Sequence, residues 1–192
     1  MYTFTLNLNG IAELTDEQFF QLCQRHELIR FERNADRSIV IRPLLGGINS
    51  NRNANLTYQL GMWNRNETLG VAFASSAGFT LPNGAVRSPN ASWLKREKWD
   101  ALTPEQKESF TPVCPDFVVE FITSDDCLKR LRAKMQEYRE NGTRLGWLID
   151  LETGKVEIYR LNQEVEILEN PATLSGEDVL PGFVLDLNSI LS

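Results

Sequence analysis

The run PDFVVEFI, residues 115–122, constrains the fold more than any other segment of the chain. Its β-branched and aromatic residues favour a β-strand. Alternate side chains of a strand point to opposite faces, so one face carries Phe117, Val119 and Phe121. The other face carries Glu120 between two aliphatic side chains. A strand that is apolar on both faces is typical of the interior of a sheet that is covered on both sides.

The segments around this run alternate between strand and helix patterns. A capping box, Thr15 with Gln18 three residues on, opens a helix, and the turn NADR joins two strands into a hairpin. Helical spacing predicts a second helix over 53–64, and a third runs from near Ser124 to a stop at Gly142. The run LLGGINSN, residues 44–51, is expected to be a loop. The predicted strands cover 28–33, 38–43, 70–76, 78–84, 91–94, 144–150 and 155–161, with charged helical turns over 95–102 and 103–110.

This order of elements predicts an α/β (α+β) fold, with a mixed β-sheet flanked by helices. The length of 192 residues suggests a single domain, 1–192. Within it, the N-terminal helix and hairpin of residues 11–43 are expected to pack on the core. The tail, residues 176–191, is expected to be an ordered closing segment.

Composition excludes several classes of protein. No apolar run approaches the roughly 18 residues of a membrane span, and the first residues lack a signal-peptide pattern. The three cysteines, Cys23, Cys114 and Cys127, form no close pair, so we expect reduced thiols in a cytoplasmic protein. The single histidine, His26, rules out a histidine-rich zinc site. Phosphate-loop and serine-hydrolase motifs are absent.

The net charge of -6 argues against a general nucleic-acid coat protein, because phosphate binding requires positive potential. One stretch differs from this average. KRLRAKMQEYR, residues 129–139, holds five of the twenty basic residues. It is either a solvated helix surface with compensating acids or a local basic face.

Glu120 is a carboxylate within an otherwise apolar strand, and such a group is seldom buried without a partner. The residues leave two interpretations open. Glu120 is either paired with a basic side chain or lines a cleft as a metal ligand, which requires further oxygen ligands nearby.

The helix that follows offers a companion for Glu120. Cys127, Leu131, Met135 and Tyr138 form one apolar stripe, and Lys134 borders it. Lys134 either extends outward to solvent or points into a cleft where it holds a phosphate or a water. Arg139 borders the opposite edge of the stripe, so periodicity alone does not distinguish the two basic residues.

RSPNASWL, residues 87–94, reads as a turn followed by a strand. Asn90 stands at the junction, where an aspartate could hold a metal ion. It is either an ordinary turn residue or a metal-ligand position without its charge.

Several spaced segments together resemble the Uma-type putative restriction endonuclease family, which belongs to the PD-(D/E)xK nuclease superfamily. They are LLGGINSNRNANLTYQL, SSAGFTLPNGAVRSPNASWL, CPDFVVEFITSDD and LRAKMQEYRENGTRLGWLID, in this order. The resemblance runs from about residue 10 to the C-terminus. It implies a restriction-endonuclease-like fold and a divalent-metal site that hydrolyses DNA phosphodiester bonds.

The resemblance also implies the site residues. The family's motif aspartate falls on Asn90 and its strand glutamate on Glu120, so these two positions are the implied metal ligands. The superfamily lysine two residues after the glutamate is Ile122 here, and the family's lysine corresponds to Lys134, with Tyr138 one turn on. Glu27 of HELIR matches an early family glutamate that supports the site.

From these residues we expect a Mg²⁺- or Mn²⁺-dependent endonuclease acting on DNA, with a homodimer implied by the resemblance alone. Asn90 offers a neutral oxygen that does not offset the charge of the cation, so the site is expected to be impaired. Two alternatives stay open. One is a non-catalytic member of the same fold that binds nucleic acid or a protein partner. The other is a structural or oligomeric module in which Glu120 is paired with a basic side chain.

Overall fold

The structure is a computed structural model that describes residues 3–8, 10–26, 28–42, 44, 46–123 and 128–191. The apolar run at 117–122 forms β8 (Phe117–Ile122), whose six residues are all buried. It is an interior strand of a six-stranded sheet with the order β11-β10-β9-β8-β7-β4. The other strands are β4 (Gly70–Ala74), β7 (Ala91–Lys95), β9 (Leu145–Asp150), β10 (Val156–Arg160) and β11 (Glu166–Leu168).

This sheet is mixed, as the sequence predicts. β8 pairs in parallel with β9 and antiparallel with β7. A parallel pair requires a crossover connection. The crossover contains α5 (Leu128–Glu140), which is the described part of the third predicted helix. Its expected start near Ser124 lies outside the described residues.

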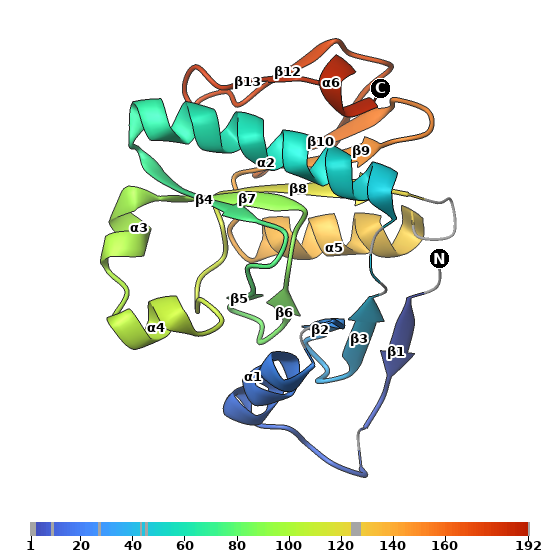
Figure 1. Cartoon of the computed structure of the whole chain (residues 1–192), viewed down its shortest axis with the longest axis vertical. Coiled ribbons are helices and arrows are strands. Elements are labelled where there is room, and N and C mark those ends of the chain that lie inside the picture. The colour runs from blue at the N-terminus through green and yellow to red at the C-terminus, as the bar shows by residue number, and fades with distance from the viewer. Residues whose placement is uncertain are drawn as a thin grey trace.

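Helices and the C-terminal segment cover the two faces of the sheet (Figure 1). On one face, Phe117, Val119 and Phe121 pack with residues of α2 (Gly47–Glu67) and of the C-terminal segment. That segment holds β12 (Thr173–Ser175), β13 (Val184–Asp186) and α6 (Asn188–Leu191), so the tail is ordered as expected. On the other face, Val118 and Ile122 pack against α5. The predicted alternation of β8 is therefore confirmed.

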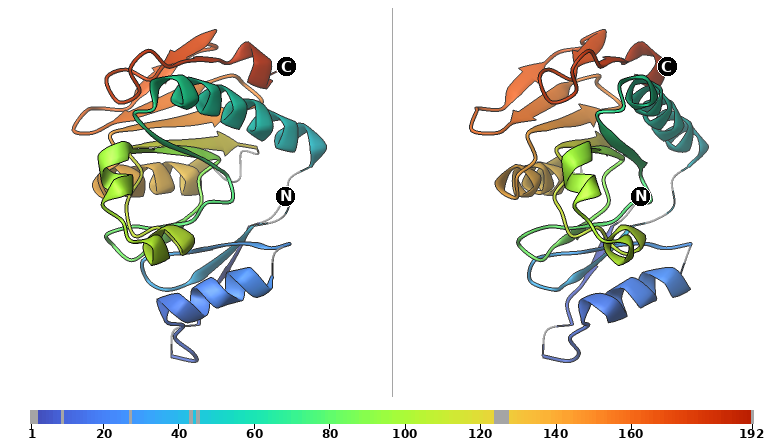
Figure 2. Two further views of the ribbon diagram at one scale, coloured as in Figure 1. Left: turned by 60° about the vertical axis from the view of Figure 1, so that its left-hand side comes forward. Right: turned by 90° about the vertical axis from the view of Figure 1, so that its left-hand side faces the viewer.

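The N-terminal hairpin belongs to a second sheet with the order β1-β3-β2-β6-β5 (Figure 2). Its strands are β1 (Phe4–Leu6), β2 (Arg30–Arg33), β3 (Ile39–Arg42), β5 (Phe79–Thr80) and β6 (Val86–Arg87). The predicted capping box of Thr15 and Gln18 begins α1 (Asp16–Arg25), and Phe19 of this helix packs on the second sheet. The division of the chain into one domain, 1–192, stays a prediction.

One predicted loop is wrong in part. α2 begins at Gly47, inside the run LLGGINSN, with Gly46 as its N-cap. Hydrogen bonds to the C-terminal segment hold this polar helix: Arg52 donates to the Leu191 carbonyl and Asn55 to the Ser189 carbonyl. These long-range contacts override the local preference of glycine, asparagine and serine for turns. The charged turns form α3 (Arg96–Asp100) and α4 (Pro104–Glu108), as expected.

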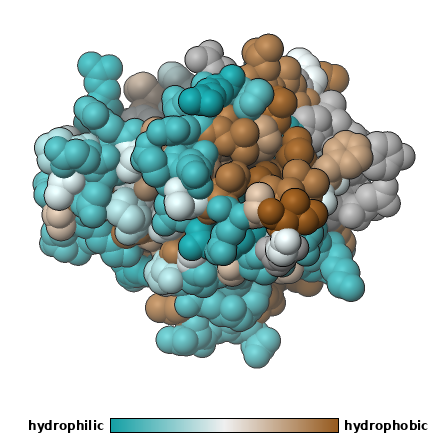
Figure 3. Space-filling model, turned by 90° about the horizontal axis from the view of Figure 1, so that it is seen from below, coloured by the Kyte–Doolittle hydropathy of each residue, from teal (hydrophilic) through white to brown (hydrophobic). Residues whose placement is uncertain are grey.

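The surface at the second sheet is not uniformly polar. Seen from this end of the molecule, apolar side chains gather beside a broad hydrophilic area (Figure 3). Phe4 and Leu6 of the edge strand β1 are among the exposed apolar residues. Within the described residues, no helix is both long and apolar enough to cross a membrane.

Candidate functional site

Glu120 and Lys134 form the centre of a buried charge cluster. Strand β8 directs the Glu120 side chain toward α5, where its Oε1 atom lies 2.5 Å from the Lys134 Nζ atom. Neither residue is open to solvent, with Glu120 at 0% and Lys134 at 5% exposure. The extended, solvated conformation that was one interpretation of Lys134 is therefore wrong. Arg139 instead donates to the Gln163 carbonyl and lies over the Tyr159 ring, away from this cluster.

A second carboxylate, Glu32, reaches the same lysine from β2 of the second sheet. Its Oε1 atom lies 2.6 Å from the Lys134 Nζ atom. Arg42 Nη1 lies 3.3 Å from the same oxygen, and the Ser88 backbone N–H also donates to it. The cluster thus joins the two sheets, with Glu120 supplied by one and Glu32 by the other.

The charges around Glu32 determine its ionisation. Full burial favours the neutral acid, but Lys134, Arg42 and Arg87 outweigh burial and lower the pKa of Glu32 to about 2. Glu32 is therefore ionised at neutral pH. The Arg87 guanidinium lies 3.9 Å from Glu32 and donates to Glu137 at 2.5 Å.

Tyr138 contacts Glu120 from the next turn of α5. Its hydroxyl donates to Glu120 Oε1 over 3.4 Å. Burial, followed by the negative charges of Glu120 and Glu32, raises the pKa of Tyr138 well above its ordinary value. Tyr138 therefore stays protonated and acts as a hydrogen-bond donor. The structure brings Tyr138, Lys134 and Glu120 together, as the family resemblance implies.

Asn90 precedes β7 and lies against β8. Its Oδ1 atom accepts the Phe121 backbone N–H at 2.9 Å, and its Nδ2 atom donates to Asn53 Oδ1 at 3.0 Å. Its backbone N–H donates to the Val119 carbonyl. Asn90 thus forms hydrogen bonds with the β8 backbone on both sides of Glu120, at Val119 and at Phe121. These contacts are those of a structural turn residue. They also place Asn90 beside Glu120, the carboxylate that a metal site would require.

Asp116 does not substitute for the missing acid. Its carboxylate accepts the Lys95 backbone N–H and lies 2.7 Å from the Lys98 ammonium. Asp116 immediately precedes β8, whereas Glu120 lies further along the strand. The distance along an extended strand keeps the two carboxylates apart.

Two carboxylate oxygen atoms of the cluster are candidate ligands for a divalent cation. Glu120 Oε2 and Glu32 Oε2 are both buried and accept no hydrogen bond from any described residue. A buried acceptor without a partner is costly, and a cation bound there would remove this cost. Carboxylate and amide oxygens are the ligands that Mg²⁺ prefers. The residues present therefore fit a Mg²⁺ ion through oxygen atoms, although the described residues hold no group of three acidic, histidine or cysteine residues arranged as a metal cluster.

The predicted Glu27 lies outside the described residues. The acid that the structure places in the cluster from this part of the chain is Glu32, which the sequence reasoning missed. One signal could have found it. Glu32 pairs in register with Val40, within a strand that is apolar from Ile39 to Ile41, so a neighbouring carboxylate is expected to be buried.

A cavity of about 290 Å³ gives access to the cluster from one side. Glu32 and Lys134 line it, together with Arg87, Arg130 and Glu137. We call it the Lys134 pocket. Glu120 is not among its lining residues and lies behind Lys134. Within the described part of the chain, Glu32 forms ion pairs with Arg42 and Arg87 as well as with Lys134. Glu120 forms its ion pair with Lys134.

The fold is a mixed α+β arrangement, and a family model matches most of the chain. The model described as "Uma2: Putative restriction endonuclease" matches residues 16–188. The chain belongs to this family. The match covers the six-stranded sheet, the second sheet except β1, and every residue of the cluster.

A solved structure has a similar fold. It is titled a putative nuclease belonging to DUF820 from Anabaena variabilis, and it superposes with a TM-score of 0.75. The sequence identity is 18%, over 93% of this chain and 97% of the other. The similarity confirms the fold predicted from sequence. No functionally curated protein matched the chain.

Proposed function

We propose that this protein is a divalent-metal-dependent endonuclease that hydrolyses DNA, with its activity lowered by Asn90. One observation carries the proposal: Lys134 bridges two buried carboxylates, Glu120 and Glu32, and each keeps one buried oxygen atom that accepts no hydrogen bond from a described residue. A pair of acids with a lysine is the minimum set for metal-assisted phosphodiester hydrolysis. The family membership supports the same chemistry.

In this proposal Glu120, Glu32 and the Asn90 Oδ1 atom hold a Mg²⁺ or Mn²⁺ ion. When bound, such an ion polarises a phosphoryl oxygen and makes a coordinated water more acidic. The Lys134 ammonium borders the Lys134 pocket, where it places positive charge beside a phosphate group. Tyr138 remains protonated and holds Glu120 in place through its hydrogen bond.

The Lys134 pocket suits a phosphate for a second reason. Arg87 and Arg130 line it as well, and an arginine binds phosphate oxygens in a bidentate manner. The acids in its wall, Glu32 and Glu137, already contact basic side chains. Those basic side chains are Lys134 and Arg87, so Arg130, which donates to Thr3, is the cation of the wall that no described acidic residue contacts and that is available to a phosphate.

A cleavage assay that compares wild type with Asn90→Asp tests the proposal. Plasmid and single-stranded DNA are incubated with Mg²⁺ or Mn²⁺, and nicks are counted on a gel. We expect the variant to cut at least about tenfold faster, because a missing ligand charge in a buried site is worth more than the 1.4 kcal/mol that a factor of ten requires. Asn90→Asp combined with Glu120→Gln is the matched control and is expected to be inactive. If neither the wild type nor Asn90→Asp cuts any DNA, the proposal fails.

The second candidate is a non-catalytic member of the fold that binds nucleic acid or a protein partner. The observation that favours it is the Asn90 amide, whose oxygen and nitrogen both have partners within the protein. Calorimetric titration with Mn²⁺ separates the two candidates. Binding that is lost in Glu120→Gln favours the enzyme, whereas no binding favours the second candidate.

The expected homodimer stays a prediction. The exposed apolar side chains of Phe4 and Leu6 lie on the edge strand β1, whose outer edge pairs with no other described strand. Sedimentation velocity of the wild type and of Phe4→Lys measures whether a dimer forms and whether it uses this edge.

A further inference from the structure

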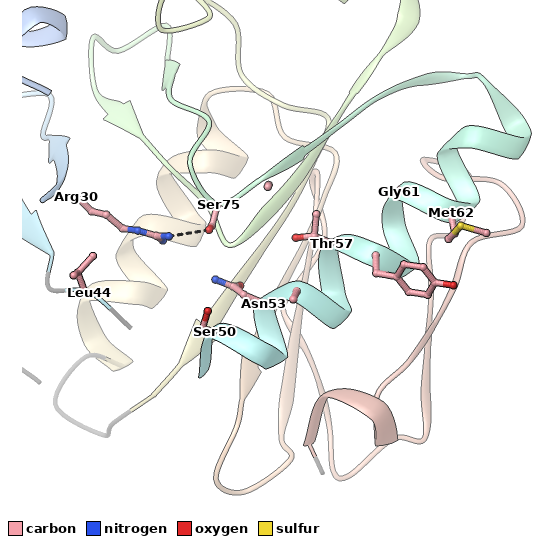
Figure 4. Close-up of a pocket in the computed structure, with 11 residues that line it drawn as sticks. Arg30, Leu44, Ser50, Asn53, Thr57, Gly61, Met62 and Ser75 are labelled. Carbon is pink, nitrogen blue, oxygen red and sulfur yellow. Dashed lines mark hydrogen bonds between the residues drawn. The ribbon is translucent and has the colours of Figure 1, made fainter. Parts of the chain in front are cut away.

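A cavity of about 740 Å³ lies along α2. We call it the α2 groove. Arg30 and Ser75 lie on one wall, and residues of α2 form the other, among them Ser50, Asn53, Thr57, Tyr58 and Gly61. Figure 4 shows that Arg30 and Ser75 face Ser50, Asn53 and Thr57 across the groove.

The α2 groove reaches the candidate site at two points. Asn53, in the groove wall, accepts the hydrogen bond from Asn90. On the opposite wall, the Ser75 carbonyl accepts the Ser88 hydroxyl, and the Ser88 backbone N–H donates to Glu32. A polymer bound in the groove would therefore pass beside the residues that are proposed to cut it.

The charge of the groove differs from that of the whole protein. The chain has 26 acidic residues and a net charge of -6, yet no acidic residue lines the groove. Residues 47–66 of α2 also contain no acid, and Glu67 is its last residue. The one charged residue in the wall is Arg30, whose guanidinium donates to Ser75 and forms no ion pair with any residue that the structure describes. A half-buried arginine that forms no ion pair with a described carboxylate can offer its guanidinium to an external anion.

The remaining side chains suit a nucleotide. Ser50, Thr57 and Ser75 supply hydroxyl donors, and Tyr58 at 66% exposure presents a ring on which a base can stack. A ring stacks on a base whose face is free, so the exposed Tyr58 favours a single strand over a duplex, whose bases are stacked on one another. We propose that the α2 groove binds single-stranded DNA, with Arg30 on a phosphate and Tyr58 on a base. This inference rests on the proposed function, because it specifies the form of DNA that reaches that site.

Gly61 allows a test that does not disturb folding. It lies within α2 in the groove wall, and a Cβ placed on it meets no atom within 4 Å. A side chain at this position therefore begins in open space at the groove wall. Replacing a helical glycine also favours the helix. Gly61→Glu places a negative charge in the groove, and Gly61→Gln is the matched neutral control of the same size.

Binding is measured without metal, so that it does not depend on cleavage. A fluorescently labelled single-stranded oligonucleotide is titrated with full-length protein in EDTA, and its anisotropy is recorded. We expect Gly61→Glu to weaken binding roughly tenfold relative to Gly61→Gln, and Tyr58→Ala to weaken it roughly tenfold through lost stacking. Ile11→Ala, which removes an exposed apolar side chain outside the groove, is expected to leave binding unchanged.

The outcomes separate this inference from the proposed nuclease. If wild type binds a single strand but the Gly61→Glu and Tyr58→Ala variants bind it equally well, the groove is not the binding site. If wild type prefers a duplex, or binds no nucleic acid, the inference is likewise wrong. Cleavage by Asn90→Asp is read in a separate assay with metal present. That assay can therefore succeed while the groove inference fails, and the reverse also holds.

Discussion

Phe117, Val119 and Phe121 point from β8 into a cluster of aromatic and aliphatic side chains, whereas Glu120 points from the opposite face into a cluster of charges. The Phe117 ring meets the Trp147 ring edge-on, with centroids 4.7 Å apart. Both faces are equally closed to solvent. They differ in what holds them. The stability that apolar packing provides does not depend on pH. A buried charge, in contrast, requires a nearby opposite charge.

The apolar face is expected to show the largest effect of a single substitution. Phe117→Ala removes a fully buried ring and leaves a cavity against Trp147. Such changes cost about 4 kcal/mol of unfolding free energy. Urea denaturation measures this value, and Phe4→Ala at an exposed ring is the control. We expect the loss to be the same at pH 5 and pH 7. A loss that changed with pH would show that this face is coupled to the charges.

Lys134→Met removes the cation at the centre of the charge cluster on the Glu120 face of β8. It leaves Glu120 and Glu32 buried without their shared cation, although Arg42 still contacts Glu32. We expect a loss of about 3 kcal/mol in urea denaturation, because an uncompensated buried charge is costly. Lys129→Met, at an exposed position of the same helix, is the control and is expected to have little effect.

A second substitution then checks the cause of this loss. Adding Glu120→Gln to Lys134→Met removes the unpaired charge as well. The double variant is expected to be more stable than Lys134→Met alone. If it is less stable, the loss comes from packing of the lysine stem and not from charge.

The charged face alone should respond to acid. Glu32 has a pKa of about 2 in the folded protein, below the ordinary value of 4.5. Its ionised form therefore stabilises the fold above about pH 4.5, and this stability is lost as the pH falls toward about 2. The full loss is on the order of 3 kcal/mol, given about 1.4 kcal/mol for each pKa unit.

Urea denaturation at several pH values in this window measures that loss. Glu32→Gln is expected to be less stable than wild type at neutral pH and to have a flatter pH dependence below about pH 4.5. An unchanged slope in Glu32→Gln would assign the acid sensitivity to another group.

The two faces also differ in how far the sequence predicted them. The alternation of β8, the capping box of α1 and the hairpin of β2 and β3 are local patterns, and the structure confirms them. The partner of Lys134 is not local, because Glu32 lies 102 residues away and belongs to a different sheet. No periodicity encodes that contact. Both hydrogen bonds of the Asn90 side chain are also long-range and could not be predicted from the turn.

Asn90→Asp is expected to have the smallest effect on stability of these substitutions. Its effect is also expected to depend on whether a divalent metal ion is present. Without metal, the new carboxylate lies beside Glu120 and faces the Asn53 oxygen, so that Asn53 has to turn its amide to donate. We expect a loss of about 1–2 kcal/mol in EDTA, as for other buried groups that lose a hydrogen-bond partner. Asn162→Asp makes the same change at an exposed turn with positive φ and is the control.

Added Mn²⁺ is expected to restore this loss in Asn90→Asp, because an ion that binds the folded state alone raises its stability by about 2.7 kcal/mol at 100 times its dissociation constant. Thermal denaturation with and without Mn²⁺ measures the recovery. Wild type should gain less, since Asn90 contributes no charge to the site. If Mn²⁺ raises the melting temperature of Asn90→Asp no more than that of Asn162→Asp, the oxygen atoms around Glu120 do not hold a cation. The buried oxygen of Glu120 would then be part of a closed ion pair with Lys134, and the charged face of β8 would be as purely structural as the apolar one.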